Sequence, residues 1–354
     1  MSNVMKIKQT RALLFSSIMF LLIWAGVCLA DNKVIVLPVE NPIMLEIETA
    51  AFEKALADDV NEGPALILVE IDTPGGQIDY AKRMCAAITQ SGGKCKIIAF
   101  IKGGQYGGAL SAGAAVAFAC NKIYMAKNTV IGAATLVTLS KDEKDKQRNY
   151  GEVIDEKLSS AWRAYLASLA QQNDRPGLLA RAMVDRNIDV VEVNQQGSRL
   201  FIEPMNRKPE QQVVRTWNKS GSLVTLTAEE AVNCTIADGL VQSRDELLKQ
   251  LQLADANVVV ENKMANARKE LQIIERRADE IRKSLDLKEK QIKYPQPAPK
   301  ALSILRGAKA DFENLKTLAQ KYPDLHYNVK QLEEVINTIS ADYENAVRET
   351  RSRK

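Results

Sequence analysis

The sequence predicts an α/β domain with a largely parallel, buried sheet, followed by an α-helical tail. Two observations predict the domain: short, uninterrupted apolar runs alternate with segments of helical spacing, and the runs show no polar face. Such strands are typical of parallel sheets that are covered on both sides. A third observation predicts the tail, because apolar residues recur at spacings of three and four from about residue 254 onward.

The first half of the domain contains four apolar runs of strand length. We expect strands at 34–39, 65–71, 96–101 and 122–125. The segments between them have helical spacing or consist of small residues. We expect helices there at 42–61, 77–90 and 110–120.

The second half begins with a polar segment at 130–150. Charges alternate from Lys141 to Lys146 without an apolar face, which predicts a mobile surface loop. A strong helix is expected from Asp155, and Thr227 with Glu230 forms a capping box for a short helix. The remaining elements are helices at 177–185 and 244–253 and short strands at 188–193, 200–202, 212–217 and 222–226.

The tail at 254–354 carries a heptad pattern in three stretches. A proline-rich break at 294–299 ends the first stretch, and a short turn around Pro323 separates the other two. The last two helices are therefore expected to fold back as an antiparallel hairpin. The pattern predicts a coiled coil that assembles copies or binds a partner, or equally an ordinary bundle within one chain.

The N-terminus has the features of a targeting segment. Lys6, Lys8 and Arg11 precede an apolar stretch at 12–30. Residues 1–30 are therefore a signal peptide cleaved before Asp31 or a retained signal-anchor. Either alternative predicts an exported chain, periplasmic or anchored to the membrane.

Composition excludes several classes of function. The net charge of +4 is spread along the chain, so we expect no nucleic-acid partner. No P-loop, dinucleotide fingerprint or zinc spacing is present, and we expect no cofactor and no metal. Four cysteines follow the targeting segment, and they predict either disulfides or small buried side chains. They are Cys85, Cys95, Cys120 and Cys234.

Two short motifs predict acyl-transfer chemistry. Asp72-Thr73-Pro74-Gly75-Gly76 follows a strand, and its glycines can turn their N–H groups outward. Gly107 to Gly113 places Ser111 at the start of a helix, where the amide of Ala112 is a second donor. Each motif alone is commonly a turn or a helix cap, but together they predict Ser111 as nucleophile and Gly75, Gly76 and Ala112 as the oxyanion hole.

The base is harder to assign from the residues. The single histidine, His326, lies far away in the tail, so a lysine is the candidate. Lys157 lies near the start of a helix, where the helix dipole disfavours the ammonium form. The same position also suits an ordinary surface lysine, and the residues alone leave both interpretations open.

At these residues the chain resembles the Clp-protease/crotonase superfamily. More closely, it resembles the NfeD-like, stomatin-partner group of membrane-associated serine proteases, which is related to signal peptide peptidase A. The similar segments are 66–76, 109–113, 121–126, 131–134, 156–170, 226–231 and 237–239. The resemblance implies a Clp/crotonase-like fold of ββα repeats over 31–253 and makes Lys157 the catalytic lysine. Leu110 and Thr235 depart from the usual pattern, where a small residue and a glycine are common.

Motifs and resemblance together predict an exported serine endopeptidase with a Ser111–Lys157 dyad. The resemblance implies cleavage of apolar segments in membrane-associated proteins, a homo-oligomer and a stomatin-like or coiled-coil partner. The alternative is a catalytically degenerate Clp-fold scaffold whose tail mediates assembly or partner binding. Crotonase-type acyl-CoA chemistry is disfavoured, because a coenzyme A enzyme is expected in the cytosol, whereas this chain is predicted to be exported.

Overall fold

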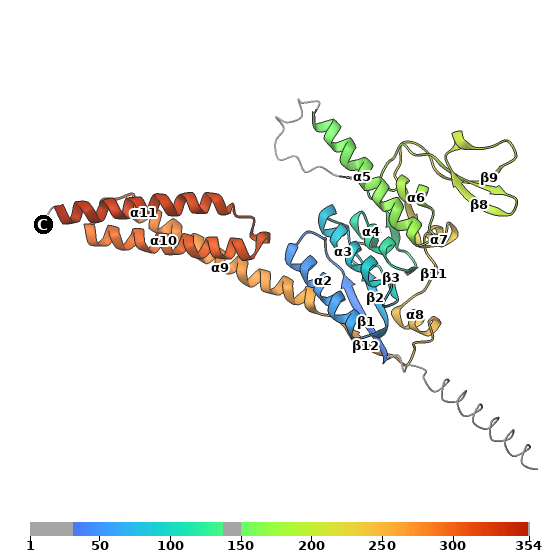
Figure 1. Cartoon of the computed structure of the whole chain (residues 1–354), viewed down its shortest axis with the longest axis horizontal. Helices are drawn as coiled ribbons and strands as arrows, with labels where there is room; N and C mark the ends of the chain where they lie inside the picture. The colour runs from blue at the N-terminus through green and yellow to red at the C-terminus, as the bar shows by residue number, and fades with distance from the viewer. Residues whose placement is uncertain (1–30, 137–149, 353–354) are drawn as a thin grey trace, which may run out of the picture.

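The computed structural model describes residues 31–136 and 150–352, which form an α/β body and an elongated helical tail (Figure 1). The predicted targeting segment at 1–30 and most of the predicted polar loop lie outside the described residues. Within the described ranges, no helix combines the length and apolar character needed to cross a membrane. Export therefore stays a prediction.

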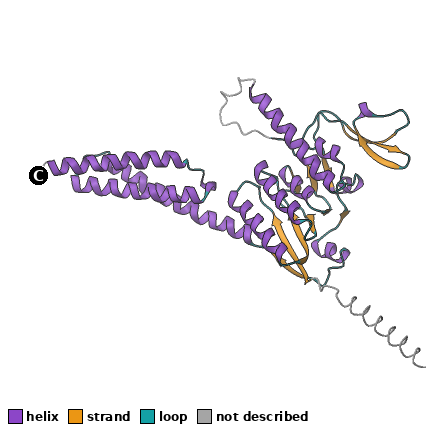
Figure 2. Ribbon diagram, in the orientation of Figure 1, coloured by secondary structure: helices purple, strands orange, loops and turns teal. Residues whose placement is uncertain are grey.

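The body is built on a six-stranded parallel sheet. Figure 2 draws its strands in orange among the purple helices. The strand order is β11-β5-β3-β2-β1-β12. The strands are β1 (Asp31–Val39), β2 (Pro64–Ile71), β3 (Ile97–Ile101), β5 (Lys122–Met125), β11 (Gly239–Leu240) and β12 (Asn257–Val260). Every residue of β3 is buried, which explains the apolar runs and confirms the predicted parallel sheet.

Helices cover both faces of this sheet. One face is covered by α2 (Glu46–Asn61), α3 (Ile78–Ser91) and α4 (Ala112–Ala119), and α5 (Tyr150–Gln172) packs on α4 to complete the larger core. The other face packs against α8 (Arg244–Gln250). Alternate residues of β1 serve the two faces, with Ile35 in the larger core and Val36 in the smaller one.

Two small sheets and two short helices complete the body. The sheet β10-β6-β4 consists of Thr225–Thr227, Val130–Gly132 and Gly108–Leu110. The sheet β8-β7-β9 consists of Ser198–Ile202, Val190–Gln195 and Gln212–Asn218, with a 3-10 turn at Pro204–Asn206. The short helices are α6 (Gly177–Ala182) and α7 (Ala228–Asn233), and the predicted capping box of Thr227 and Glu230 is present at α7.

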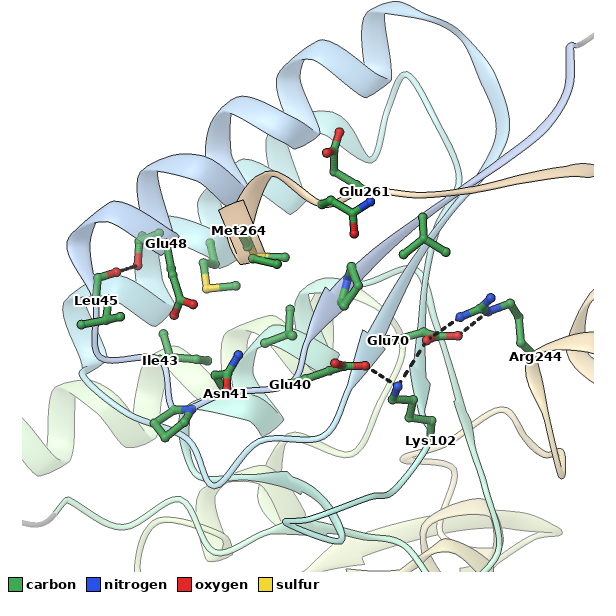
Figure 3. A pocket seen from close by; sticks show the side chains of 18 residues that line it. Glu40, Asn41, Ile43, Leu45, Glu48, Glu70, Lys102, Arg244, Glu261 and Met264 are labelled. Carbon is green, nitrogen blue, oxygen red and sulfur yellow. Dashed lines mark hydrogen bonds and ion pairs between the residues drawn. The ribbon is translucent and has the colours of Figure 1, made fainter. Parts of the chain in front are cut away.

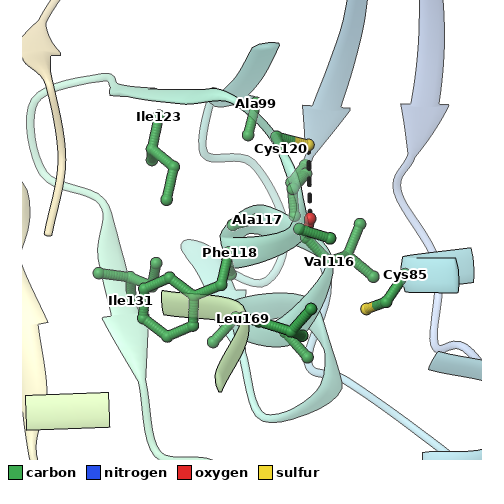
Figure 4. Packing of buried hydrophobic residues seen from close by; sticks show 14 of the residues in the cluster. Cys85, Ala99, Val116, Ala117, Phe118, Cys120, Ile123, Ile131 and Leu169 are labelled. Carbon is green, nitrogen blue, oxygen red and sulfur yellow. Dashed lines mark hydrogen bonds between the residues drawn. The ribbon is translucent and has the colours of Figure 1, made fainter. Parts of the chain in front are cut away.

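The four cysteines are free and buried. Figure 4 shows Cys85 and Cys120 among apolar side chains, where the Cys120 thiol donates to the carbonyl of Val116 at 3.4 Å. Burial raises the pKa of the Cys85 thiol to about 12. Of the two predicted interpretations, the structure supports small buried side chains.

The structure corrects three predicted boundaries. Residues 42–45, predicted as helix, are extended because Ile43 pairs with Gly76. The strong helix begins at Tyr150 rather than Asp155. The body does not end at residue 253: β12 pairs in parallel with β1, so the sheet continues to Val260.

The tail consists of three helices: α9 (Lys263–Ile292), α10 (Ala298–Lys321) and α11 (Val329–Ser352). The predicted break lies between α9 and α10. As predicted, α10 and α11 lie side by side and are joined by the 3-10 turn η3 (Pro323–Leu325) (Figure 1). All three helices contribute to a small core of Ala278, Leu315, Ala319 and Leu332. A coiled coil between chains stays a prediction.

Candidate active site

Two loops meet at one end of the parallel sheet. The first, at 72–76, follows β2, and the second, at 107–113, includes β4 and the start of α4. Thr73 connects them: its amide donates to Gly108 at 2.8 Å, and its carbonyl accepts from the amide of Leu110 at 3.1 Å. The two motifs, 35 residues apart in the sequence, are therefore neighbours in the fold.

Ser111 lies in an unusual backbone conformation, with φ 52° and ψ −119°. A residue with a Cβ pays about 1–3 kcal/mol for such a conformation. Its amide donates to Gly132 at 2.8 Å, and its carbonyl accepts from Ala114 at 3.0 Å. The hydroxyl makes no capping bond to α4, so Ser111 is not an ordinary N-cap. The side chain is only partly buried and is available to a substrate.

Gly75 lies directly against the serine. Its φ of +97° favours glycine, and a Cβ there would lie 2.5 Å from the Cβ of Ser111 and 2.9 Å from the amide nitrogen of Ala112. No side chain fits between the loop and the serine. Only glycine allows the two loops to approach this closely.

The three predicted oxyanion donors differ in their hydrogen bonds. The amide of Gly75 donates to the hydroxyl of Thr73 at 3.1 Å and is used inside the loop. Within residues 31–136 and 150–352, no hydrogen bond uses the amides of Gly76 or Ala112. Two unpaired amides beside a partly exposed serine are the arrangement that an oxyanion hole requires.

The predicted base, Lys157, lies on α5. Lys157 is exposed. Burial on α5 is described from residue 156 onward, and the first buried residue there is Trp162, five residues after Lys157. Trp162 anchors the helix by donating to the carbonyl of Ala134 at 2.9 Å. Among the described residues, no hydrogen bond or ion pair links Ser111 with Lys157 or with His326, which follows η3 in the tail.

Comparisons with known proteins identify the domain that carries this site. Residues 33–208 match the family model of the NfeD1b N-terminal domain. Over these residues, just under half of the chain, the sequence is similar to that domain. The predicted resemblance to NfeD-like proteins is thereby confirmed.

Two curated relatives are similar to the chain. Membrane protein NfeD1b of Bacillus subtilis (strain 168) is 30% identical over 260 residues, which are 72% of this chain and 50% of the relative. Membrane-bound protease PH1510 of Pyrococcus horikoshii is 27% identical over 176 residues, which are 49% of this chain and 37% of the relative. The chain thus spans half or less of the length of these relatives.

Solved structures of proteases are also similar. A variant of the 1510-N membrane-bound stomatin-specific protease is 21% identical, with a TM-score of 0.48, over 66% of this chain and 99% of that one. ClpP1 of Listeria monocytogenes is 15% identical, with a TM-score of 0.35, over 62% of this chain and 96% of that one.

Two positions within residues 33–208 support the site, although no role was predicted for them from the sequence. The buried Asp72 carboxylate accepts from the amides of Tyr106 and Gly108, each at 3.1 Å, and so fixes the glycine-rich loop before β4. Ile43 donates to the carbonyl of Gly75 at 2.8 Å and accepts from Gln77 at 2.8 Å. The motif marked Asp72, whereas nothing in the sequence indicated Ile43.

A cavity of about 250 Å³ lies behind this support, at the carboxyl ends of β12, β1 and β2 (Figure 3). Ile43 lines it, so the segment at 40–45 separates the cavity from the glycine loop; we call this segment the strap. Deep in the cavity Glu70 accepts from Arg244 at 2.6 and 2.9 Å. Among the described residues, no cluster of three or more histidine, cysteine or carboxylate side chains could hold a metal ion.

Proposed function

We propose that this chain is a serine endopeptidase with Ser111 as nucleophile. The observation that carries the proposal is the close approach of Gly75 to Ser111 beside two unpaired amides. The Ser111 hydroxyl attacks the scissile carbonyl, and the amides of Gly76 and Ala112 stabilise the developing oxyanion. Such a donor contributes about 3–4 kcal/mol in related chemistry. Gly75 serves by its small size rather than by its amide.

Lys157 is the proposed base, on the strength of its position in the segment 156–170. It takes the serine proton during attack and returns it to the leaving amine, after which water hydrolyses the acyl-enzyme. The lysine is exposed in the single chain, so the dyad forms only when the first turns of α5 approach a serine. A bound substrate or a second copy of the chain would provide that approach and would desolvate the amine.

The proposed substrate is an exposed apolar peptide segment of a membrane-associated protein. The 1510-N protease is named as stomatin-specific, and by that likeness a stomatin-like protein is the proposed partner of this chain. A homo-oligomer, export and anchoring through residues 1–30 belong to the same proposal.

The second candidate function is a catalytically inactive scaffold. The exposure of Lys157, without a hydrogen bond or ion pair to Ser111 among the described residues, favours it, because a serine without a base reacts slowly. On this alternative, the helical tail mediates assembly or partner binding and the body only holds it.

Labelling by a serine-reactive fluorophosphonate separates the two candidates. The dyad predicts labelling that is absent in Ser111→Ala and at least 100-fold slower in Lys157→Ala. Lys127→Ala, which removes another exposed lysine beyond the serine, is the matched control and should label normally. Full reactivity in Lys157→Ala would exclude this lysine as the base, and an unreactive wild-type chain would support the scaffold.

A further inference from the structure

Helix α2 lacks a capping residue of its own. Its N-cap position is Leu45, whose side chain makes no capping hydrogen bond. The first N–H groups of a helix need acceptors, and an uncapped start commonly costs about 1 kcal/mol. The missing acceptor comes from elsewhere in the chain.

Asp324 supplies that acceptor from the turn of the tail. Its two carboxylate oxygens accept from the amides of Glu46 at 2.7 Å and Ile47 at 2.9 Å, across 278 and 277 residues of sequence. Asp324 is 6% exposed, so the contact is enclosed. A carboxylate at a helix N-terminus is also favoured by the helix dipole.

Neighbouring contacts hold the tail in this position. The Tyr322 hydroxyl donates to Glu270 at 2.6 Å and ties the turn to α9. Arg268 of α9 in turn donates to Glu48 of α2 at 2.6 Å. The turn η3 and the start of α2 are thus connected directly through Asp324 and indirectly through α9.

The start of α2 continues directly into the strap. Figure 3 shows Asn41, Ile43 and Leu45 along this segment. The Asn41 carbonyl accepts from the Thr73 hydroxyl at 2.7 Å, and Ile43 is bonded to Gly75 and Gln77. A Cβ on Gly76 would lie 2.1 Å from the carbonyl oxygen of Ile43, so the strap fixes where Gly76 can lie.

We propose that Asp324 is a positioning residue for the candidate active site, acting through α2 and the strap on the Gly76 amide. The inference rests on the proposed function, in which that amide binds the oxyanion. The docked turn is then the active arrangement. Because the oxyanion exists only in the transition state, losing the cap should lower kcat and leave KM nearly unchanged.

The test uses the full chain and two readouts. Hydrogen exchange follows the amides of Ile43 and Gln77, and hydrolysis of a fluorogenic apolar peptide gives kcat and KM. In Asp324→Ala we expect exchange at both amides to accelerate about fivefold and kcat to fall about tenfold. Asp324→Asn keeps an acceptor and should retain most activity.

A second pair of variants separates capping from a general loss of stability. Leu45→Ser offers a capping hydroxyl within α2 and should restore kcat when combined with Asp324→Ala. Lys316→Ala removes an ion pair with Glu333 between α10 and α11, at 3.3 Å, and should leave kcat unchanged.

The outcomes distinguish this inference from the proposed function. Faster exchange confined to Glu46 and Ile47 in Asp324→Ala, or an unchanged kcat, overturns the positioning role. A wild-type chain that neither hydrolyses the peptide nor reacts with fluorophosphonate overturns the proposed function. In that case the exchange rates at Ile43 and Gln77 still decide whether Asp324 positions the strap.

Discussion

The hydroxyl of Thr73 accepts the amide proton of Gly75 at 3.1 Å and donates its own proton to the carbonyl of Asn41 at 2.7 Å. One buried side chain therefore joins the glycine loop to the strap. Its methyl group also lies at α4, since a Cβ on Gly113 would come within 2.5 Å of it. The three segments around Ser111 thus share one side chain as a common contact.

Thr73→Val keeps the shape of this side chain and removes both hydrogen bonds. We expect the free energy of unfolding to fall by about 1–3 kcal/mol, because the Gly75 amide and the Asn41 carbonyl lose a buried partner. Fluorophosphonate labelling of Ser111 should slow as well, because the loop is no longer tied to the strap. Urea unfolding and labelling rates measure the two effects. Thr73→Ser, which keeps the hydroxyl, is the control, and equal losses in both variants would contradict the explanation.

Gly76→Ala should disrupt the candidate site by a steric clash with the strap rather than by the loss of a hydrogen bond. The new methyl would lie 2.1 Å from the Ile43 carbonyl oxygen, which is backbone and has little freedom to move away. We expect a loss of about 1–3 kcal/mol in stability and loss of serine labelling. Gly93→Ala is the matched control, because a Cβ there meets nothing within 4 Å. Normal labelling of Gly76→Ala in a folded chain would remove Gly76 from the site.

The sequence was sufficient for the central strands of the main sheet because these strands are buried on both faces. The apolar runs of β2 and β3 follow directly from that burial. The three-residue strands β4 and β6 were missed because Gly108 and Gly132, both with positive φ, hide the strand pattern. β12 was missed because this strand has only four residues, which is too short to show a periodic pattern after the predicted helix.

The candidate site was predictable only in part, for a physical reason. Ser111, Gly75, Gly76 and Ala112 lie in two local motifs, and the structure places Gly75 directly against Ser111 and Ala112. The strap and Asp324 depend on contacts between segments far apart in the chain, which no local spacing reports. Lys157 remains a prediction, because it is exposed and no hydrogen bond or ion pair links it to the serine among the described residues.

Arg244→Ala should destabilise the body, because the buried carboxylate of Glu70 loses the hydrogen bonds from Arg244. Glu70 is 2% exposed on β2 and accepts two hydrogen bonds from Arg244 at the start of α8 (Figure 3). Lys102 remains 3.7 Å away, so we expect a loss of about 2–3 kcal/mol rather than the larger cost of an unpaired charge.

A double variant tests the assignment of this loss. Glu70→Gln removes the buried charge, so its combination with Arg244→Ala should cost less than the sum of the two single changes in urea unfolding. Arg282→Ala breaks an exposed pair with Asp279 and should cost less than about 1 kcal/mol. Additive losses at Glu70 and Arg244 would show that the pair is not coupled.

Asp59 gives the junction between α2 and α9 a pH dependence. The residue is 3% exposed, its Oδ2 has no hydrogen-bond partner among the described residues, and Lys263 lies 4.0 Å from Oδ1. Burial outweighs the nearby ammonium and raises the pKa of this carboxyl from 3.8 to about 6. The folded chain therefore binds this proton more tightly than the unfolded chain.

The sign of the effect follows from that difference. Between about pH 4 and pH 6 the folded state holds the proton that the unfolded state has lost, so this residue lowers stability as the pH rises. Asp59→Asn removes the charge, so at pH 7 this variant should have a higher free energy of unfolding than wild type, by up to about 3 kcal/mol. Its unfolding temperature should be higher as well. At pH 4 the two proteins should be nearly equal. Asp58→Asn, at a neighbouring exposed carboxylate, is the matched control. A gap between Asp59→Asn and wild type that stays constant from pH 4 to pH 7 would show that Asp59 is not protonated in the folded chain.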